Sequence, residues 1–169
     1  MQSSERIYRD QAQQDDFFDA DLTDARLKVN PQAAHASFHA KSSESLATRF
    51  MQSLQQAEAT KTVASLVELF AENADLSNLA MHEPIRGKEA IRQFWQNYLS
   101  VFEQIRSHFT HTSEGSGTIA LEWTSEGTLS SGEPIRYRGV SILETQAGQV
   151  QHFRTYYDSA AFLPQGAKA

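Results

Sequence analysis

Apolar residues recur at helical spacing in three segments after residue 41. The first segment has Ser42 or Ser43 available as an N-cap, and it carries these apolar residues on one face: Leu46, Phe50, Leu54 and Ala57. The second segment runs from about Lys61 to Ala71. The third, "KEAIRQFWQNYLSVF", presents a broad apolar face made by Ile91, Phe94, Trp95, Tyr98 and Phe102. Such faces are typical of helices that pack against a core, so the pattern predicts three helices.

From Ile105 onward the apolar period changes to two, which indicates strands. In "GTIALEWTSEG", Ile119, Leu121 and Trp123 alternate with polar or small neighbours. The turn signals "SSGE" and "QAGQ" separate this strand from "PIRYRGVSILE" and from the run that begins at Val150. The helices followed by antiparallel strands predict an α+β domain, with the helices packed on one face of a curved sheet.

The last strand, "VQHFRTYYDSAAF", has two unequal faces. One face carries Gln151, Phe153, Thr155 and Tyr157, and the other carries Val150, His152, Arg154, Tyr156 and Asp158. Charged side chains are costly to bury. The first face is therefore predicted to point inward.

The chain is predicted to divide into an N-terminal extension (1–41), one folded domain (42–164) and a short tail (165–169). Within the extension, "DDFFDADL" places Phe17, Phe18 and Leu22 among acidic residues. This segment suits docking to a partner or to the chain's own domain, although a solvated tail explains it equally well. His35 and His39 have helical metal-pair spacing, but no further ligand lies nearby, so no metal site is expected.

Charge and composition narrow the classes of partner. Fifteen Lys and Arg against 21 Asp and Glu give a net charge of −6, which argues against nucleic acid and anionic membrane surfaces. The absence of cysteine excludes disulfides and thiol chemistry. No apolar span or signal profile is present in the sequence, so a cytoplasmic protein without a cofactor is expected.

Two stretches, "LVELFAENADLSNLAMHEPIRGKEAIRQFWQNYL" and "GVSILETQAGQVQHFRTYYD", resemble the nuclear transport factor 2-like superfamily, in particular its SnoaL-like branch of bacterial proteins. The resemblance covers about Ser45 to Leu163. It implies a cone-shaped half-barrel in which three N-terminal helices and a curved antiparallel sheet enclose an apolar pocket. It also implies a homodimer formed through the outer face of the sheet. Members of this superfamily differ widely in activity, so fold alone does not assign function.

The resemblance also allows known chemistries to be tested by position. In ketosteroid isomerases the base position falls on Asn78, the tyrosine position near Phe50 or Leu54, and the acid position on Val140. None of these residues supplies the required group. In limonene-epoxide hydrolases the acid of the last strand falls on Thr155, which is a poor base.

Asp158 and His82 remain as candidate proton carriers, although Asp158 also suits a turn cap and His82 an exposed loop. The walls of the pocket are predicted to be Phe50, Leu54, Phe70, Trp95, Leu121, Trp123, Val140, Phe153 and Tyr157. The ligand-binding set is predicted to be Asn78, Trp95, Trp123, Arg138, Phe153, Thr155 and Tyr157. The leading hypothesis is a protein that binds a small hydrophobic ligand. An isomerase, cyclase or lyase acting on a hydrophobic carbonyl compound and a dimeric interaction module are the alternatives.

Overall fold

The computed structural model describes residues 44–163, which form an α+β unit. Its helices are α1 (Leu46–Thr60), α2 (Ala64–Val67) and α3 (Lys88–Ser100). Its strands are β1 (Phe70–Asn78), β2 (Ile85–Arg86), β3 (Phe102–Gly115), β4 (Thr118–Leu129), β5 (Pro134–Gln146) and β6 (Gln149–Tyr157), and a 3-10 turn, η1, covers Ser159–Phe162. The "DDFFDADL" segment and the pair His35 and His39 lie outside the described residues.

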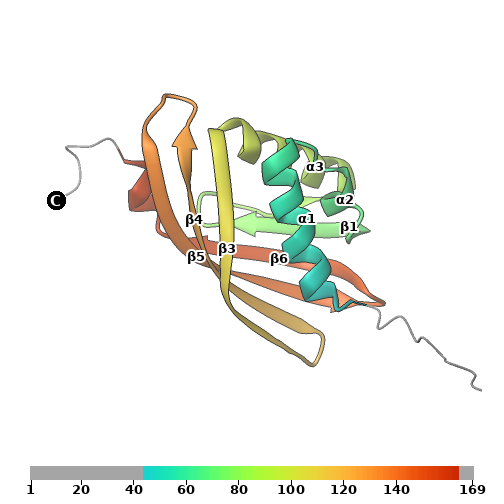
Figure 1. Cartoon of the computed structure of the whole chain (residues 1–169). Coiled ribbons are helices and arrows are strands. Elements are labelled where there is room, and N and C mark those ends of the chain that lie inside the picture. Colours follow the sequence, from blue (N-terminus) through green and yellow to red (C-terminus); the bar gives the residue numbers. More distant parts are fainter. Residues whose placement is uncertain (1–43, 164–169) are drawn as a thin grey trace, which may run out of the picture. The chain divides into compact units, whose positions relative to one another are not determined.

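The six strands form one curved sheet in the order β2-β1-β6-β5-β4-β3. All neighbours are antiparallel except β1 and β6, which are parallel. Helices α1 and α3 lie on the same side of this sheet (Figure 1). The predicted α+β class with a curved, mostly antiparallel sheet is therefore confirmed.

The hairpin turns follow from local chemistry. At the β5–β6 turn, Ala147 and Gly148 both have positive φ, as do Ser116 and Gly117 at the β3–β4 turn. Two-residue turns of this kind match the right-handed twist of the strands that they join. The predicted "SSGE" and "QAGQ" turns both lie between strands, where the sequence pattern placed them.

The boundaries of several elements differ from the prediction. The N-cap of α1 is Ser45, whose hydroxyl accepts a hydrogen bond from the Thr48 amide. The predicted second helix is only the four residues of α2, because the chain becomes strand β1 at Phe70. The third helix stops at Ser100, since Phe102 already pairs with Leu129 as the first residue of β3.

Bulges explain a further difference on β6. Thr145 of β5 pairs with Val150, while the adjacent Glu144 pairs with His152, so Gln151 is an extra residue in the ladder. Val150 is consequently fully buried, although simple alternation grouped it with the outward face. β3 carries similar irregularities between Phe102 and Gln104 and between Phe109 and His111.

The core lies between the helices and the inner face of the sheet. Phe153 of β6 is at its centre, with its ring 5.6 Å from the Phe50 ring of α1 and 5.6 Å from the Trp95 ring of α3. Phe70 packs edge-on against both phenylalanines. This aromatic cluster holds α1 and α3 against the sheet. None of the helices within residues 44–163 has the length and apolar character needed to span a membrane.

Candidate functional site

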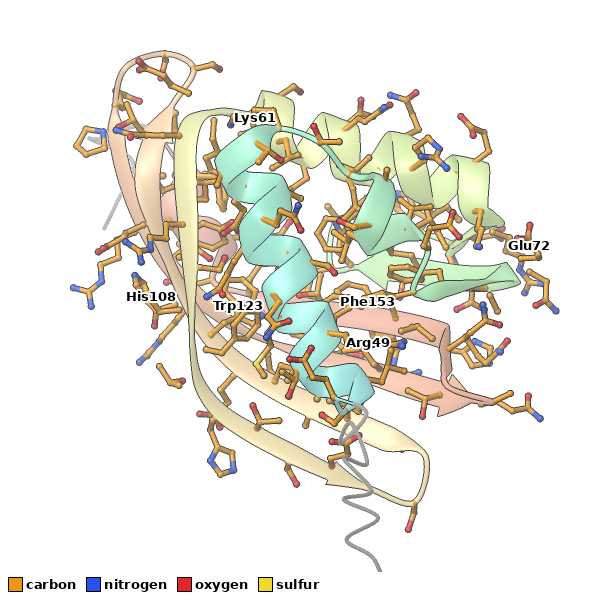
Figure 2. All side chains as sticks on the ribbon, turned by 45° about the vertical axis from the view of Figure 1, so that its right-hand side comes forward. Arg49, Lys61, Glu72, His108, Trp123 and Phe153 are labelled. Carbon is orange, nitrogen blue, oxygen red and sulfur yellow. The ribbon has the colours of Figure 1, made fainter. Side chains whose placement is uncertain are left out.

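A cavity of about 270 Å³ opens beside the aromatic core, between α3, η1 and the inner face of the sheet. Helix α3 supplies one wall, and strands β4, β5 and β6 supply the opposite wall. Figure 2 shows Trp123 and Phe153 between α1 and the sheet, whereas His108 points away from the interior. The lining is Leu54, Asn78, Phe94, Trp95, Asn97, Tyr98, Val101, Phe102, Ser107, Trp123, Ser125, Tyr137, Ser141, Phe153, Thr155, Tyr157 and Phe162.

The exposed members of this lining mark the mouth of the cavity. They are Asn97, Val101 at the end of α3, and Phe162 of η1. The Phe162 ring lies 4.9 Å from the Tyr137 ring and 6.0 Å from the Tyr157 ring, both edge-on. The short 3-10 turn therefore closes one side of the cavity with an aromatic ring, and Asp158 fixes that turn by accepting a hydrogen bond from the Ala160 amide.

A buried carboxylate lies behind one end of the cavity. Glu58 of α1 is 4 % exposed and accepts three hydrogen bonds. The Ser107 amide donates to Oε2 at 2.7 Å, the Ser107 hydroxyl donates to Oε1 at 2.6 Å, and the Tyr98 hydroxyl donates to Oε1 at 3.2 Å. Ser107 Oγ also lies 2.7 Å from Ser125 Oγ. A buried charge is tolerated when several donors satisfy it, as they do here.

Two tyrosines beside this network are held in their neutral form. Burial, followed by the proximity of Tyr137 and the charge of Glu58, raises the pKa of Tyr98 well above its ordinary value. Burial is also the main reason that the pKa of Tyr137 is raised to about 12, and the neighbouring hydroxyls of Tyr98 and Ser125 partly offset it. Both phenols therefore remain protonated throughout the physiological pH range.

A second polar chain crosses the sheet wall of the cavity. The Trp123 indole N–H donates to Ser141 Oγ at 3.0 Å, and Ser141 Oγ lies 3.1 Å from Thr155 Oγ1. These three residues occupy neighbouring strands, β4, β5 and β6. The indole nitrogen of Trp123 is thus already satisfied within the protein.

Trp95 differs from Trp123 in this respect. Its side chain lines the cavity and is 5 % exposed, yet its indole Nε1–H is buried without a hydrogen-bond partner in the described part of the chain. Buried donors in folded proteins are almost always paired. Trp95 therefore places on the cavity wall a side chain whose own donor lacks a partner.

The predicted ligand-binding residues fall into two groups. Six of them line the cavity: Asn78, Trp95, Trp123, Phe153, Thr155 and Tyr157. Arg138 does not, because β5 alternates and turns Arg138 and Val140 to the outer face, while Tyr137 and Ser141 point inward. The predicted placement of Arg138 and Val140 at the pocket is therefore wrong. Because Val140 points outward, it does not mark the position of the acid found in the pocket of ketosteroid isomerases.

Three other predicted wall residues lie in the core and not on the cavity. Phe50 and Phe70, which belong to the aromatic cluster, and Leu121 are fully buried and do not reach the lining. Large side chains at these positions fill the interior, which is the ordinary result of close packing. Leu54 is the member of the α1 face that reaches the cavity.

The two candidate proton carriers lie outside the cavity. Asp158 is exposed, acts as the N-cap of η1 and borders a hollow on the outer face with Arg138. His82 is exposed in the loop before β2 and borders a separate hollow, which shares Asn78 and Thr155 with the cavity. Asn78 itself uses Oδ1 to accept from the Ala80 amide. Within residues 44–163, no group of three or more histidine or acidic side chains is arranged to hold a metal ion.

Sequence reasoning missed Glu58, Ser107, Ser125, Tyr137 and Ser141. A signal for Glu58 was present, because it follows Phe50 and Leu54 at intervals of four on the buried face of α1. The serines and Tyr137 occupy inward positions of alternating strands. The alternation in the sequence showed which face of each strand these residues occupy. Small polar residues at inward positions, however, carry no chemical signature until their partners are known.

A protein-family model supports the assignment of this fold. The SnoaL-like domain matches residues 47–153, which is more than half of the chain. The chain belongs to the SnoaL-like domain family. This family lies within the nuclear transport factor 2-like superfamily, so the family predicted from the sequence is confirmed. No curated protein matches the chain.

Solved structures show the same SnoaL-like fold at low identity. An NTF2-like protein from Anabaena variabilis ATCC 29413 aligns with a TM-score of 0.63 and 19% identity, over 69% of this chain and 89% of that protein. A protein with a ketosteroid isomerase-like fold from Catenulispora acidiphila DSM 44928, in complex with trimethylamine, aligns with a TM-score of 0.61 and 17% identity, over 69% and 90%. An LEH-like epoxide hydrolase from M. tuberculosis aligns with a TM-score of 0.55 and 12% identity, over 69% and 82%. At these identities the likeness concerns the fold alone.

Proposed function

We propose that this SnoaL-like protein binds a small, mainly apolar molecule of one or two rings in its cavity. We further propose that an acceptor oxygen of this molecule takes the indole N–H of Trp95. The observation that supports the proposal is that Trp95, which lines the cavity, has a buried Nε1–H without a hydrogen-bond partner among the described residues.

The size of the cavity limits the ligand. Pockets for drug-sized molecules range from about 300 to 1,000 Å³, whereas an apolar cavity of about 150 Å³ already accommodates benzene. At about 270 Å³ this cavity lies between those cases. The volume therefore favours a one- or two-ring compound over a steroid.

The chemistry of the lining supports an apolar ligand with few polar atoms. Most of the wall consists of aromatic rings, and the Trp123 indole is already paired with Ser141. The Trp95 indole, in contrast, has no partner among the described residues, and a buried donor without a partner costs about 1–3 kcal/mol. A ligand oxygen at this position would recover much of that cost.

Binding is favoured over enolisation of the ketosteroid isomerase kind. That reaction needs hydroxyl donors directed at a developing oxyanion. The Tyr98 hydroxyl instead donates to Glu58, and the inward neighbours of Val140 on β5 are Gly139 and Ser141, neither of which is an acid. The two residues considered as proton carriers are not available either, since Asp158 caps η1 on the outside and His82 is in an exposed loop.

A matched pair of ligands tests the proposal. Tetralin and α-tetralone have the same two-ring skeleton, but only α-tetralone has an acceptor oxygen. Isothermal titration calorimetry is expected to show α-tetralone binding at least about fivefold more tightly, as pairing a buried donor predicts. In Trp95→Phe this preference should disappear, while tetralin keeps comparable affinity.

Trp123→Phe is the matched control. It also removes one indole from the cavity wall, but that N–H is already bonded to Ser141, so the preference for α-tetralone should persist. Equal affinity of the two ligands for the unaltered protein would contradict the role of Trp95. Absence of binding by both would contradict the proposed function as a whole.

A further inference from the structure

We infer that the cavity contains a second polar subsite, formed by Tyr98, Ser107 and Ser125, which accepts a hydrogen bond from a hydroxyl group of the ligand. The inference rests on the proposed function and specifies its ligand class: small ring compounds that carry a phenolic or alcoholic hydroxyl. Tyr98, Ser107 and Ser125 all line the cavity, and Glu58 lies directly behind them.

Glu58 is surrounded by hydrogen-bond donors. The Ser107 backbone amide is a donor and nothing else, so Oε2, at 2.7 Å, must be an acceptor. The 2.6 Å contact between Ser107 Oγ and Oε1 has the length of an O–H···O⁻ hydrogen bond. With a third donor from Tyr98 on Oε1, both oxygens of Glu58 are occupied as acceptors, as an ionised carboxylate requires.

The hydroxyls of Tyr98, Ser107 and Ser125 contribute three protons to this network. Each serine or tyrosine hydroxyl has a single proton to donate. Tyr98 and Ser107 direct theirs to Glu58. The proton of the 2.7 Å contact between Ser107 and Ser125 must therefore come from Ser125. All three protons are committed toward the carboxylate, so Tyr98, Ser107 and Ser125 themselves offer a ligand only oxygen lone pairs; the Tyr137 hydroxyl beside Tyr98 and Ser125 keeps a proton of its own.

The direction of these three protons makes the subsite selective for a ligand that donates a hydrogen bond. A ligand hydroxyl can donate to one of these lone pairs, and the negative charge of Glu58 behind them strengthens that bond. An ether or carbonyl oxygen placed at the same position would face lone pairs and lose its hydration without compensation. The subsite formed by Tyr98, Ser107 and Ser125 therefore selects a donor, whereas Trp95 selects an acceptor.

The geometry at Glu58 also predicts that Glu58→Gln reverses the direction of the hydrogen bonds to Ser107 and Tyr98. In Glu58→Gln the amide oxygen must face the Ser107 N–H, as Oε2 does in the unaltered protein. The amide nitrogen then occupies the position of Oε1, where both hydroxyl contacts converge. Its two protons are donated to Ser107 and Tyr98, so the protons of these two hydroxyls become free to point into the cavity.

The experiment compares tetrahydronaphthol, a phenol on the tetralin skeleton, with its methyl ether by isothermal titration calorimetry. Both oxygens can accept from Trp95, so their difference isolates donation by the ligand. The unaltered protein is expected to prefer the phenol by about tenfold, consistent with one buried hydrogen bond. Glu58→Gln should reduce this ratio to near one or reverse it, and urea unfolding will check that the variant folds.

Ser125→Ala is a second variant that leaves Glu58 in place. It removes one acceptor on the cavity wall and should lower the preference for the phenol over its methyl ether. Equal affinity of phenol and ether for the unaltered protein, or an unchanged ratio in Glu58→Gln, would overturn the inference even if α-tetralone still exceeds tetralin. Absence of binding by every compound would overturn the proposed function and this inference together.

Discussion

At the scale of single residues, Glu58 organises the polar end of the cavity without belonging to its wall. Its carboxylate fixes the direction of the Tyr98 and Ser107 hydroxyls, and through Ser107 that of Ser125. Removing one member of a buried polar network leaves the others unsatisfied. Substitutions at Glu58 are therefore expected to change both stability and the selectivity of the cavity.

The raised pKa of Tyr137 makes stability depend on alkaline pH. Because its pKa is about 12 in the folded chain and about 10 when unfolded, the folded state keeps a proton that the unfolded state loses between those values. This contribution is fully present below about pH 10 and declines as the pH rises toward 12. Stability should fall across this window, and Tyr137→Phe should make the fall shallower by up to about 1.4 kcal/mol per pH unit.

Urea unfolding followed by tryptophan fluorescence from about pH 9 to about pH 11 measures this slope. Tyr156→Phe is the control, because it removes an exposed tyrosine from the opposite face of β6. Identical slopes for the unaltered protein and Tyr137→Phe would contradict the assignment of a buried, neutral phenol.

Some residues of the site were predictable from the sequence and others were not. Period-two alternation correctly placed Phe153 and Thr155 inside, since burial of uncharged side chains is a strong local signal. Glu58 was missed because an acid on a helix is usually exposed. Only its partners Ser107 and Tyr98, 49 and 40 residues away in the chain, make its burial possible.

At the scale of elements, β5 and β4 pack closely because of one glycine. Gly139 pairs with Trp123, and a Cβ at Gly139 would lie 2.6 Å from the Trp123 ring and 2.3 Å from the Tyr156 carbonyl oxygen. The carbonyl cannot move without breaking the sheet, so a methyl group has no room. The absence of a side chain at Gly139 lets the Trp123 indole approach the strand closely and donate to Ser141.

Gly139→Ala is therefore expected to destabilise the protein by about 1–3 kcal/mol or more, since the added methyl overlaps backbone atoms. Gly115→Ala is the matched control, because a Cβ there meets no atom within 4 Å. Urea unfolding of both variants gives the comparison. Similar stabilities for the two would show that the sheet near Trp123 relaxes more readily than the packing implies.

The elements themselves were predicted unevenly. The strands after Ile105 were recognised because their alternation is regular. The start of β1, Phe70 and Ala71, was taken as the end of a helix because Leu66, Val67 and Phe70 also fit helical spacing. Bulges are the other cause of error. The extra residue at Gln151 shifts the parity of Val150, and single-residue insertions in a ladder leave little trace in the sequence.

At the scale of the whole molecule, the fold fixes where a cavity lies and the side chains decide what enters it. SnoaL-like and NTF2-like proteins share this sheet at 12–19% identity, which is too low to transfer an activity. A homodimer through the outer face of the sheet stays a prediction carried by the family resemblance. The polar atoms around the cavity, and not the fold, carry the proposal of a ligand with an acceptor oxygen.

The most direct test uses the two tryptophans, Trp95 and Trp123, which give two indole N–H signals in a proton–nitrogen correlation spectrum. Trp95→Phe assigns them. Addition of α-tetralone is predicted to move the Trp95 signal downfield, since its proton gains a hydrogen bond, while tetralin causes no such shift and the Trp123 signal, already bonded to Ser141, moves less. A Trp95 signal that responds identically to both compounds would contradict the claim that this indole binds a ligand oxygen.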